Sequence, residues 1–463
     1  MAGEWRQASI GALCDAGVAE LQTGPFGTQL HAYDYVDDGV PVVPTEAIRG
    51  RQIDHSVLPK ITRTKAQELE RHRLRSGDIL FARRGVQATG HIGCVRAAED
   101  GFICGTGAIR LRVASASDEI DPDYLSHVLA DPSSVEWFKF HAIGATMPNL
   151  NEGIIRSFQL SVPPLAEQRA IAHILGTLDD KIELNRRMSE TLEAMARALF
   201  KSWFVDFDPV RAKAASRPSM ACGPRLGPIG EAEGKDSGLP KHLADLFPDS
   251  FEDSELGEIP REWEVKSLSD LCSTQYGYTA SAVDEPIGPK FLRVTDINKR
   301  NWIEWADVPH CAVEPKAGES YALCVGDLVV ARMADPGKSA IIEEKVDAVF
   351  ASYLVRLKTT SLANSYYVYG FLKSDQYAEY SAGAKSGSVQ ANMNARVIVG
   401  ARLVVPTPAV VEQYLHAILP LRRQLVATVR ESRTLATLRD TLLPKLISGE
   451  LRVKNTERVA EVA

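Results

Sequence analysis

The sequence lacks most of the features that mark a secreted, membrane-spanning or metal-binding protein. Its seven cysteines are scattered along the chain, and no two of them form the C-x-x-C pair of a zinc site or the spacing pattern of a disulfide framework. No apolar run approaches the roughly 20 residues that cross a bilayer, and the first residues show neither the basic start nor the apolar stretch of a secretory signal. These absences predict a cytoplasmic protein without a structural metal or disulfides.

A surplus of positive charge is also missing, because the formal net charge is −7 at pH 7. A protein that grips a phosphate backbone alone usually carries an excess of Lys and Arg. Two local basic clusters nevertheless occur: Arg63, Lys65, Arg71, Arg73, Arg75, Arg83 and Arg84 in the first half of the chain, and Lys290, Arg293, Lys299 and Arg300 in the second. Either cluster alone is consistent with a solvated face. Their equivalent places in the two halves favour a binding surface, with partner proteins supplying the remaining positive charge.

No constellation of catalytic residues is present. The Asn/Asp-Pro-Pro-aromatic loop that an adenine methyltransferase needs to hold the flipped amino group does not occur. Residues 336–339 (PGKS) resemble the end of a phosphate-binding loop, but Arg332 stands where that motif needs its first glycine. Asp249, Glu264 and Lys266 have a nuclease-like spacing but lie in or beside a linker, and the histidines show no metal-ligand spacing. The sequence therefore predicts a chain without a catalytic or metal centre of its own.

What the sequence does contain is a long internal repeat. Glu4-Trp5 returns as Glu262-Trp263, residues 76–79 (SGDI) as 325–328 (VGDL), residues 149–151 (NLN) as 392–394 (NMN), and residues 164–168 (PLAEQ) as 408–413 (PAVVEQ). The copies lie about 245 to 260 residues apart, too far for a solenoid, whose units span roughly 20–50 residues. The shared order indicates a duplication of one globular unit followed by one helix. Two related but divergent units suggest two related but different targets.

Each copy is expected to fold as a mixed α/β unit, in which β-rich runs alternate with turn-rich loops. The runs are residues 39–43, 78–82 and 108–113, with counterparts at 291–294, 327–331 and 353–357. The predicted division is 1–160 and 259–405 for the globular domains, 161–208 and 406–452 for the long helices, 209–258 for a linker, and 453–463 for a tail. The expected fold class is α+β with internal duplication.

Both long helices carry an apolar seam with spacings of three and four residues. The first is expected from Leu165 to about Trp203, a rod of about 60 Å, with one polar seam position at Asn185. The second is expected to kink or break near Leu419, because Pro420 lies inside it. The predicted seam residues are Ile171, Leu175, Leu178, Ile182, Leu192, Leu199, Leu415, Ile418, Leu425, Val429, Leu438 and Leu442.

The order globule–helix–globule–helix lets the two helices pair as an antiparallel coiled coil, with one globule at each end and an approximate internal two-fold axis. The alternative is that each helix packs only on its own domain.

Several segments resemble the specificity subunits of type I DNA restriction–modification systems. They are residues 163–171 (PPLAEQRAI), 178–182 (LDDKI), 199–207 (LFKSWFVDF) and 438–451 (LRDTLLPKLISGEL), together with 23–27 (TGPFG) and 256–260 (LGEIP). With the duplication, the resemblance covers nearly the whole chain. The interiors of the globular units depart from it, and in this family those interiors encode the target.

The resemblance implies two target recognition domains, each reading one half of a bipartite DNA sequence, and helices that set the distance between the half-sites. A rod of the expected length matches one to one and a half turns of duplex, since a turn covers about 34–36 Å. The family is non-catalytic and binds no cofactor directly. Two modification subunits transfer a methyl group from S-adenosylmethionine to adenine N6, and restriction subunits that use ATP and Mg join the same assembly.

Candidate DNA contacts are polar residues on loops of the globular units, because Arg suits guanine and Asn or Gln suits adenine in the major groove. They are Thr23, Thr28, Arg71, Arg73, Arg83, Arg84 and Gln87 in the first unit, and Tyr276, Tyr278, Lys290, Arg293, Lys299, Arg300, Arg332 and Lys385 in the second. About half are expected to contact phosphates or solvent. Arg83 and Arg332 are equivalent across the repeat, which favours phosphate anchoring for both. The repeated asparagines, Asn149, Asn151, Asn392 and Asn394, are expected first as turn and helix-entry residues and second as contacts to DNA or methyltransferase.

Two other classes of protein remain open from the sequence. An autonomous DNA enzyme such as a nuclease would show metal-dependent cleavage by the chain alone, and the missing catalytic constellation argues against it. A DNA-binding regulator that dimerises through its coiled coil would form homodimers, and the duplication, which already supplies a two-fold within one chain, argues against that.

Overall fold

A computed structural model describes residues 4–27, 29–115, 117–144, 146–215, 239–384 and 392–453. Two of the candidate contacts, Thr28 and Lys385, lie outside these residues. The chain divides into two compact units, which we call unit 1 (Met1–Ile182 with Thr434–Ala463) and unit 2 (Glu183–Arg433). Within the described ranges, none of the helices combines the length and apolarity that crossing a membrane requires.

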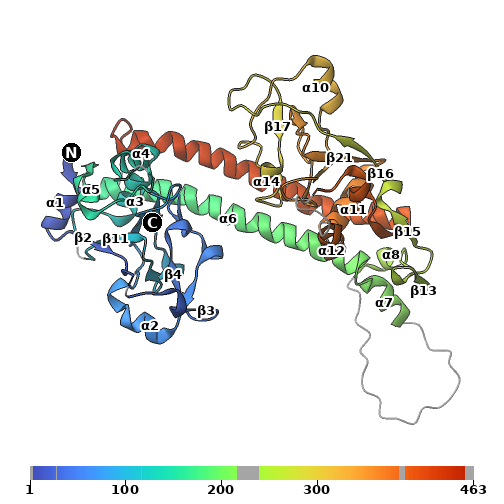
Figure 1. Ribbon diagram of the computed structural model, residues 1–463, viewed down its shortest axis with the longest axis horizontal. Coiled ribbons are helices and arrows are strands. Elements are labelled where there is room, and N and C mark those ends of the chain that lie inside the picture. The colour runs from blue at the N-terminus through green and yellow to red at the C-terminus, as the bar shows by residue number, and fades with distance from the viewer. Residues whose placement is uncertain are drawn as a thin grey trace, which may run out of the picture. The chain divides into compact units, whose positions relative to one another are not determined.

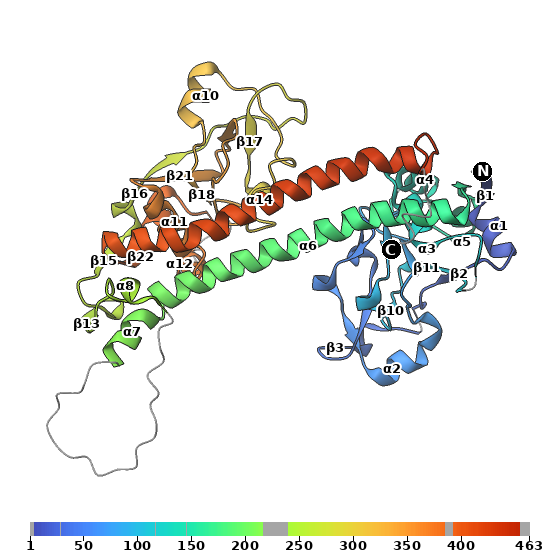
Figure 2. The same ribbon diagram turned by 180° about the vertical axis from the view of Figure 1, so that it is seen from behind.

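Unit 1 is built on a four-stranded antiparallel sheet, with helices and a second small sheet around it (Figures 1 and 2). Across the main sheet the strands are β2 (Ala19–Thr23), β11 (Ala108–Val113), β8 (Ile79–Ala82) and β9 (Ile92–Cys94). The small sheet contains β10 (Ile103–Cys104), β4 (Val40–Val43), β7 (Lys60–Ile61) and β3 (Tyr35–Val36), and two further pairs join β1 (Arg6–Ser9) to β12 (Gln159–Val162) and β5 (Ile48–Arg49) to β6 (Gln52–Ile53). The helices are α1 (Ile10–Asp15), α2 (Arg63–Glu68), α3 (Pro122–Ala130), α4 (Pro132–His141) and α5 (Glu152–Ser157).

Unit 2 repeats this plan. Its main sheet runs β16 (Cys272–Tyr276), β21 (Leu354–Thr359), β18 (Leu328–Ala331) and β19 (Ser339–Ile341), and its pairs join β15 (Glu264–Ser267) to β22 (Arg402–Val405), β17 (Lys290–Leu292) to β20 (Ala348–Phe350) and β13 (Phe251–Ser254) to β14 (Gly257–Pro260). The helices are α7 (Asp208–Ala215), α8 (Lys241–Ala244), α9 (Val294–Ile297), α10 (Pro315–Tyr321), α11 (Leu362–Leu372), α12 (Asp375–Ala384) and α13 (Ala395–Val399).

The duplication predicted from the sequence is confirmed by the strand order. The order β2–β11–β8–β9 matches β16–β21–β18–β19, the antiparallel pair β1–β12 matches β15–β22, and the parallel pair β4–β10 matches β17–β20. Strand β8 is apolar throughout because both of its faces are covered: Ile79 and Phe81 face one core cluster, and Leu80 and Ala82 another. Strand β18 divides its residues between two clusters in the same alternating way.

The two long helices are α6 (Leu165–Phe204) and α14 (Pro408–Ile447), each of 40 residues or about 60 Å. Asp179 pairs with Arg439 in unit 1, and Asn185 donates a hydrogen bond to Glu431 in unit 2. Residue numbers thus rise along α6 as they fall along α14, so the helices pair antiparallel, and the predicted mutual pairing is confirmed (Figures 1 and 2).

Of the expected kink or break near Leu419, the break does not occur, and one predicted seam residue, Leu438, is exposed. Helix α14 continues without a break through Pro420, which is exposed, so that water can hydrate the carbonyl that the proline leaves without a donor. Leu438 is 46% exposed, because its neighbour Arg439 faces α6 at that level and pairs with Asp179. The other predicted seam residues are buried or half-buried. Some of them, such as Leu199, also pack on the core of a globular unit.

Folded structure also extends into the segment expected to be a linker. The Lys213 ammonium on α7 donates hydrogen bonds to the carbonyls of Ala244, the last residue of α8, and of Asp245 and Phe247 after it, with a distance of 2.6 Å to Phe247. The Phe247 ring is buried against Trp203 and Trp263. The described ends of this segment therefore belong to unit 2.

Candidate nucleic-acid interface

In unit 1, three loops that are far apart in the sequence meet at one surface. The Leu150 amide donates to the carbonyl of Arg83 at 2.8 Å, and the Arg83 Nε donates to Asn149 Oδ1 at 2.9 Å. The Thr89 hydroxyl donates to the carbonyl of Pro148 at 3.0 Å. We call the described residues of 23–29, 83–89 and 142–151 surface 1. It joins the loop after β2, the β8–β9 loop and the segment before α5, and the predicted candidates Thr23, Arg83, Arg84 and Gln87 all lie on it.

Unit 2 has the same arrangement at the same place in its fold. The Met393 amide donates to the carbonyl of Arg332 at 2.9 Å, as Leu150 does to Arg83. The Arg332 guanidinium lies 5.0 Å from the centre of the Tyr276 ring, and the Arg83 guanidinium lies 5.9 Å from the Phe26 ring. We call the described residues of 276–282, 332–338 and 383–394 surface 2.

The repeated asparagines explain why this framework recurs. Asn151 Oδ1 accepts a hydrogen bond from the amide of Ile154 at the start of α5, and Asn394 Oδ1 accepts one from Val397 at the start of α13. Both are N-cap residues that satisfy an otherwise unpaired helix amide. The helix-entry role predicted for these residues is confirmed.

The outer residues of the two surfaces differ although the framework is shared. Surface 1 exposes several large apolar side chains: Phe26, Val86, Ile143 and Met147. Beside surface 2 the exposed large side chains are Tyr276 and Tyr353. Exposed apolar side chains that lie together in a patch mark binding surfaces. An apolar side chain can also contact the methyl group of thymine. The sequence reasoning missed the apolar residues of surface 1, because only the repeated NLN motif beside them pointed to this loop.

The candidates on surface 1 differ in how firmly they are held. The Thr23 hydroxyl donates to Glu152 at 2.9 Å, and Arg83 is fixed by Asn149 and by the Phe26 ring. Arg84 and Gln87 are exposed, and their side chains have no hydrogen-bond or ion-pair partner among the described residues. Of the candidates predicted from the sequence, they are therefore the two on surface 1 whose side chains are free to contact a ligand.

Arg71 and Arg73 do not join surface 1. They precede β8, whereas Arg83 follows it, and four strand residues span about 13 Å. Arg73 Nε donates to Glu70 at 2.8 Å, and Arg71 Nε donates to His72 Nε2 at 2.9 Å. The first basic cluster of the sequence is thus divided between the two ends of a strand.

The remaining candidates of unit 2 are mostly engaged within the protein. Lys290 Nζ donates to the carbonyl of Val308 at 2.7 Å, and Arg293 makes two hydrogen bonds to Asp296, at 2.9 and 3.0 Å. Arg300 lies 3.5 Å from Glu304, and the half-buried Tyr278 packs against the Tyr321 ring. Lys299 is exposed. Of the described candidates in unit 2, only Tyr276, Tyr278 and Arg332 belong to surface 2.

No metal centre accompanies these surfaces: across the residues that the structure describes, no three His, Cys, Asp or Glu side chains are grouped to hold an ion.

Comparison with known proteins shows what this chain is similar to. Residues 18–194 match the family model described as "Type I restriction modification DNA specificity domain". The chain is 26% identical to the type I restriction enzyme HindI specificity subunit of Haemophilus influenzae, over 71% of this chain and 77% of that protein. It is 24% identical to the MjaIX specificity subunit of Methanocaldococcus jannaschii, over 73% and 71% of the two chains.

Among solved structures, the type I restriction–modification S subunit from M. genitalium matches with a TM-score of 0.55 and 14% identity, covering 96% of each chain, so the two share a fold. The predicted resemblance is thereby confirmed. The names describe specificity subunits and a specificity domain, in agreement with the non-catalytic role expected from the sequence.

Proposed function

We propose that this chain, a specificity subunit of a type I restriction–modification system by its sequence and its fold, reads a bipartite DNA target with one globular unit for each half-site. The observation that carries the proposal is the pair of surfaces 1 and 2. Each has the same arginine, the same backbone hydrogen bond and the same asparagine cap, but a different set of exposed side chains. One scaffold presenting two different outer faces suits two related but different sequences.

Within surface 1, the roles follow from how each side chain is held. Arg84 and Gln87 are free to form the paired hydrogen bonds by which Arg reads guanine and Gln reads adenine. Arg83 is held through its Nε, which leaves its two terminal nitrogens for a phosphate. Val86 and Met147 offer apolar contacts to thymine methyl groups.

The helices α6 and α14 serve as the spacer between the half-sites. Each has 40 residues, about 60 Å, which exceeds one turn of duplex at about 34–36 Å. The buried polar seam position Asn185, bonded to Glu431, fixes the register of the pair, a role in which buried polar seam residues are well attested. A fixed register gives a fixed distance between the half-sites.

The chain acts within an assembly rather than alone. Its net charge of −7 leaves part of the phosphate neutralisation to partners. We assign these partners as two modification subunits that methylate adenine N6 with S-adenosylmethionine, and restriction subunits that use ATP and Mg.

The test is to co-express the chain with its proposed partner, an adenine methyltransferase subunit of a type I system, and to map N6-methyladenine across the host genome by single-molecule sequencing. The proposal predicts methylation at a split, asymmetric motif that disappears when this chain is omitted. Methylation that is absent, or that does not depend on the chain, would contradict it.

A further inference from the structure

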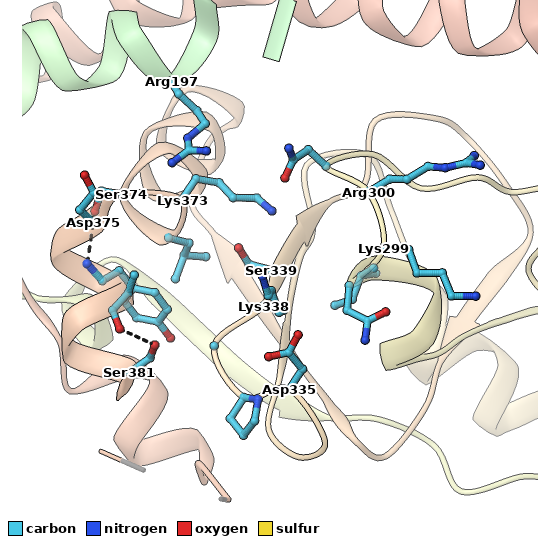
Figure 3. A pocket seen from close by; sticks show the side chains of 18 residues that line it. Arg197, Lys299, Arg300, Asp335, Lys338, Ser339, Lys373, Ser374, Asp375 and Ser381 are labelled. Atoms are coloured by element: carbon cyan, nitrogen blue, oxygen red, sulfur yellow. Dashed lines mark hydrogen bonds between the residues drawn. The ribbon is translucent and has the colours of Figure 1, made fainter. Parts of the chain in front are cut away.

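Unit 2 contains a cavity that adjoins surface 2 and shares residues 335–338 with it. Its volume is about 600 Å³, within the range of small-molecule sites, which is roughly 300–1,000 Å³. Its walls come from four places: α6 at Arg197, residues 297–301, the β18–β19 hairpin at residues 335–339, and the junction of α11 with α12 at residues 372–381 (Figure 3).

Three cations, Arg197, Lys338 and Lys373, line this cavity together with the carboxylates of Asp335 and Asp375. Figure 3 shows Arg197 reaching down from α6 and Lys373 reaching from the end of α11 into the same space, with Lys338 on the hairpin opposite. No ion pair involves any of the three in the described part of the chain; the contact found for Lys373 is with the Tyr369 ring, at 5.5 Å. Burial lowers the pKa of Lys373 to about 8; Glu193 opposes this shift, and the charges of Lys338 and Arg197 add to it. An anion in the cavity would relieve this repulsion.

Two further hydroxyl groups of the cavity wall, Ser339 and Tyr377, are closed to a ligand, because both residues are buried and their side-chain oxygens have no accessible surface. Cations without an ion pair that line one cavity are what an absent anionic ligand would leave behind.

The fold itself does not require this set of residues, because the repeat in unit 1 lacks it. Ile92 of β9 pairs with Phe81 of β8, just as Ser339 of β19 pairs with Val330 of β18. Ile92 therefore takes the place of Ser339 in unit 1. His91, the preceding residue, takes the place of Lys338. Lys373 directly precedes the serine that caps α12. At the equivalent place in unit 1, Ala130 directly precedes the residue that caps α4. The polar cavity is therefore an addition to unit 2.

The cavity is not a phosphate-binding loop of the backbone type, although residues 336–339 line it. The Gly337 amide donates to the carbonyl of Ala331 at 2.9 Å, and the Lys338 amide donates to the carbonyl of Asp335 at 3.3 Å. These amides are already used within the hairpin, so the anion must be bound by side chains.

We propose that this cavity binds phosphate groups, with Arg197, Lys338 and Lys373 on the phosphate oxygens. The cavity's volume favours a free, nucleotide-sized ligand; the same chemistry is also offered by a phosphodiester of the DNA backbone. The site shares Lys338 with surface 2, but the binding of phosphate does not depend on the reading of bases.

The test is isothermal titration calorimetry of the full chain with sodium pyrophosphate and with ADP, without divalent metal. Binding is expected to weaken by about tenfold or more in Lys373→Met, because charge-assisted hydrogen bonds contribute strongly. The matched control is Lys316→Met, which removes an exposed lysine of α10 outside the cavity.

A second arm separates the two sources of phosphate. The affinity for a duplex of about 40 base pairs is measured at several salt concentrations for the wild type and for Lys373→Met. The loss of one phosphate contact lowers the magnitude of the slope of log K against log salt concentration by about 0.9. Binding of pyrophosphate or ADP that is lost in Lys373→Met but kept in Lys316→Met identifies a free ligand. A changed slope without pyrophosphate or ADP binding identifies the DNA backbone.

No binding of either anion together with an unchanged slope overturns the proposal. That result is distinguishable from a failure of the proposed function, because binding of duplex DNA by the wild type is measured in the same series. Melting temperatures of both variants show whether they are folded.

Discussion

At the scale of single residues, Arg83 and Arg332 show how a side chain can be fixed for one role while its neighbour stays free for another. Each arginine lies over an aromatic ring, and each accepts a hydrogen bond at its carbonyl from the segment before a helix. The next residue in unit 1, Arg84, is exposed and unpaired among the described residues. The framework therefore supports the reading residues without including them.

The reading role of surface 1 predicts a selective defect. Replacing Arg84 and Gln87 by Ala should lower methylation at the wild-type motif by about tenfold or more, because one good paired contact to a base is worth about 1–3 kcal/mol. The new methylation pattern should tolerate other bases in one half-site only. Lys316→Ala, on exposed α10, is the control. Relaxation of both half-sites to the same degree would count against separate reading.

The buried His72 predicts a dependence of stability on pH. Burial lowers the pKa of this side chain to about 4, and the charges of Arg71 and Arg110 add to the effect. In the unfolded chain the same group titrates near pH 6.5, so between about pH 6.5 and 4 the unfolded state binds one more proton. The unfolding free energy should thus fall as the pH drops through this window, by about 2–3 kcal/mol from His72.

Denaturant unfolding of the wild type and of His72→Phe at both ends of that window tests this expectation. The decrease in unfolding free energy on acidification should be smaller in His72→Phe than in the wild type. An equal loss in both proteins would show that His72 becomes protonated in the folded state near its ordinary pKa.

At the scale of secondary-structure elements, the seam between α6 and α14 is more polar than its apolar pattern indicates. Arg422 is 1% exposed and forms ion pairs with Glu193 on α6 and with Glu343. Its guanidinium also lies 5.2 Å from the Tyr369 ring. The sequence predicted both helices and most of the seam, because spacings of three and four are a local property. It could not predict this cluster, because the partners of Arg422 are remote in the sequence and only the fold brings them together.

Breaking the Arg422 cluster should be costly. Arg422→Met leaves the buried Glu193 and the half-buried Glu343 without their cation, and removing one member of a buried ion pair costs about 3–5 kcal/mol. Adding Glu193→Gln and Glu343→Gln to the same chain should recover part of the loss, because the uncompensated charges are then gone. The unfolding free energy from denaturant titration checks both steps. A cost under about 1 kcal/mol for Arg422→Met would mean that the cluster is hydrated.

The spacer role predicts a change in DNA spacing. Four residues inserted after Leu184 in α6, matched by four inserted after Thr434 in α14, keep the pairs Asp179–Arg439 and Asn185–Glu431 on either side. Both helices lengthen by about 6 Å, close to two base-pair steps of about 3.4 Å. The spacer of the methylated motif should grow by about two base pairs. An unchanged spacer would refute the idea that the helices set the distance.

At the scale of the whole molecule, the duplication could be predicted from ordered short motifs, and the repeated strand order confirms it. The surfaces could be predicted only in part. Arg83 and Arg84 were found because the residues preceding them are repeated, but Val86, Ile143 and Met147 meet only through the fold of unit 1. A target-reading surface assembled from loops leaves no periodic pattern in the sequence, because its side chains need not pack against a core.

The central claim is that each globular unit reads one half-site, and the most direct measurement maps N6-methyladenine for a chain in which residues 259–405 are replaced by a second copy of residues 1–160. Co-expressed with the methyltransferase, this chain should methylate a motif whose two half-sites carry the same bases. Persistence of the original asymmetric motif would contradict the claim.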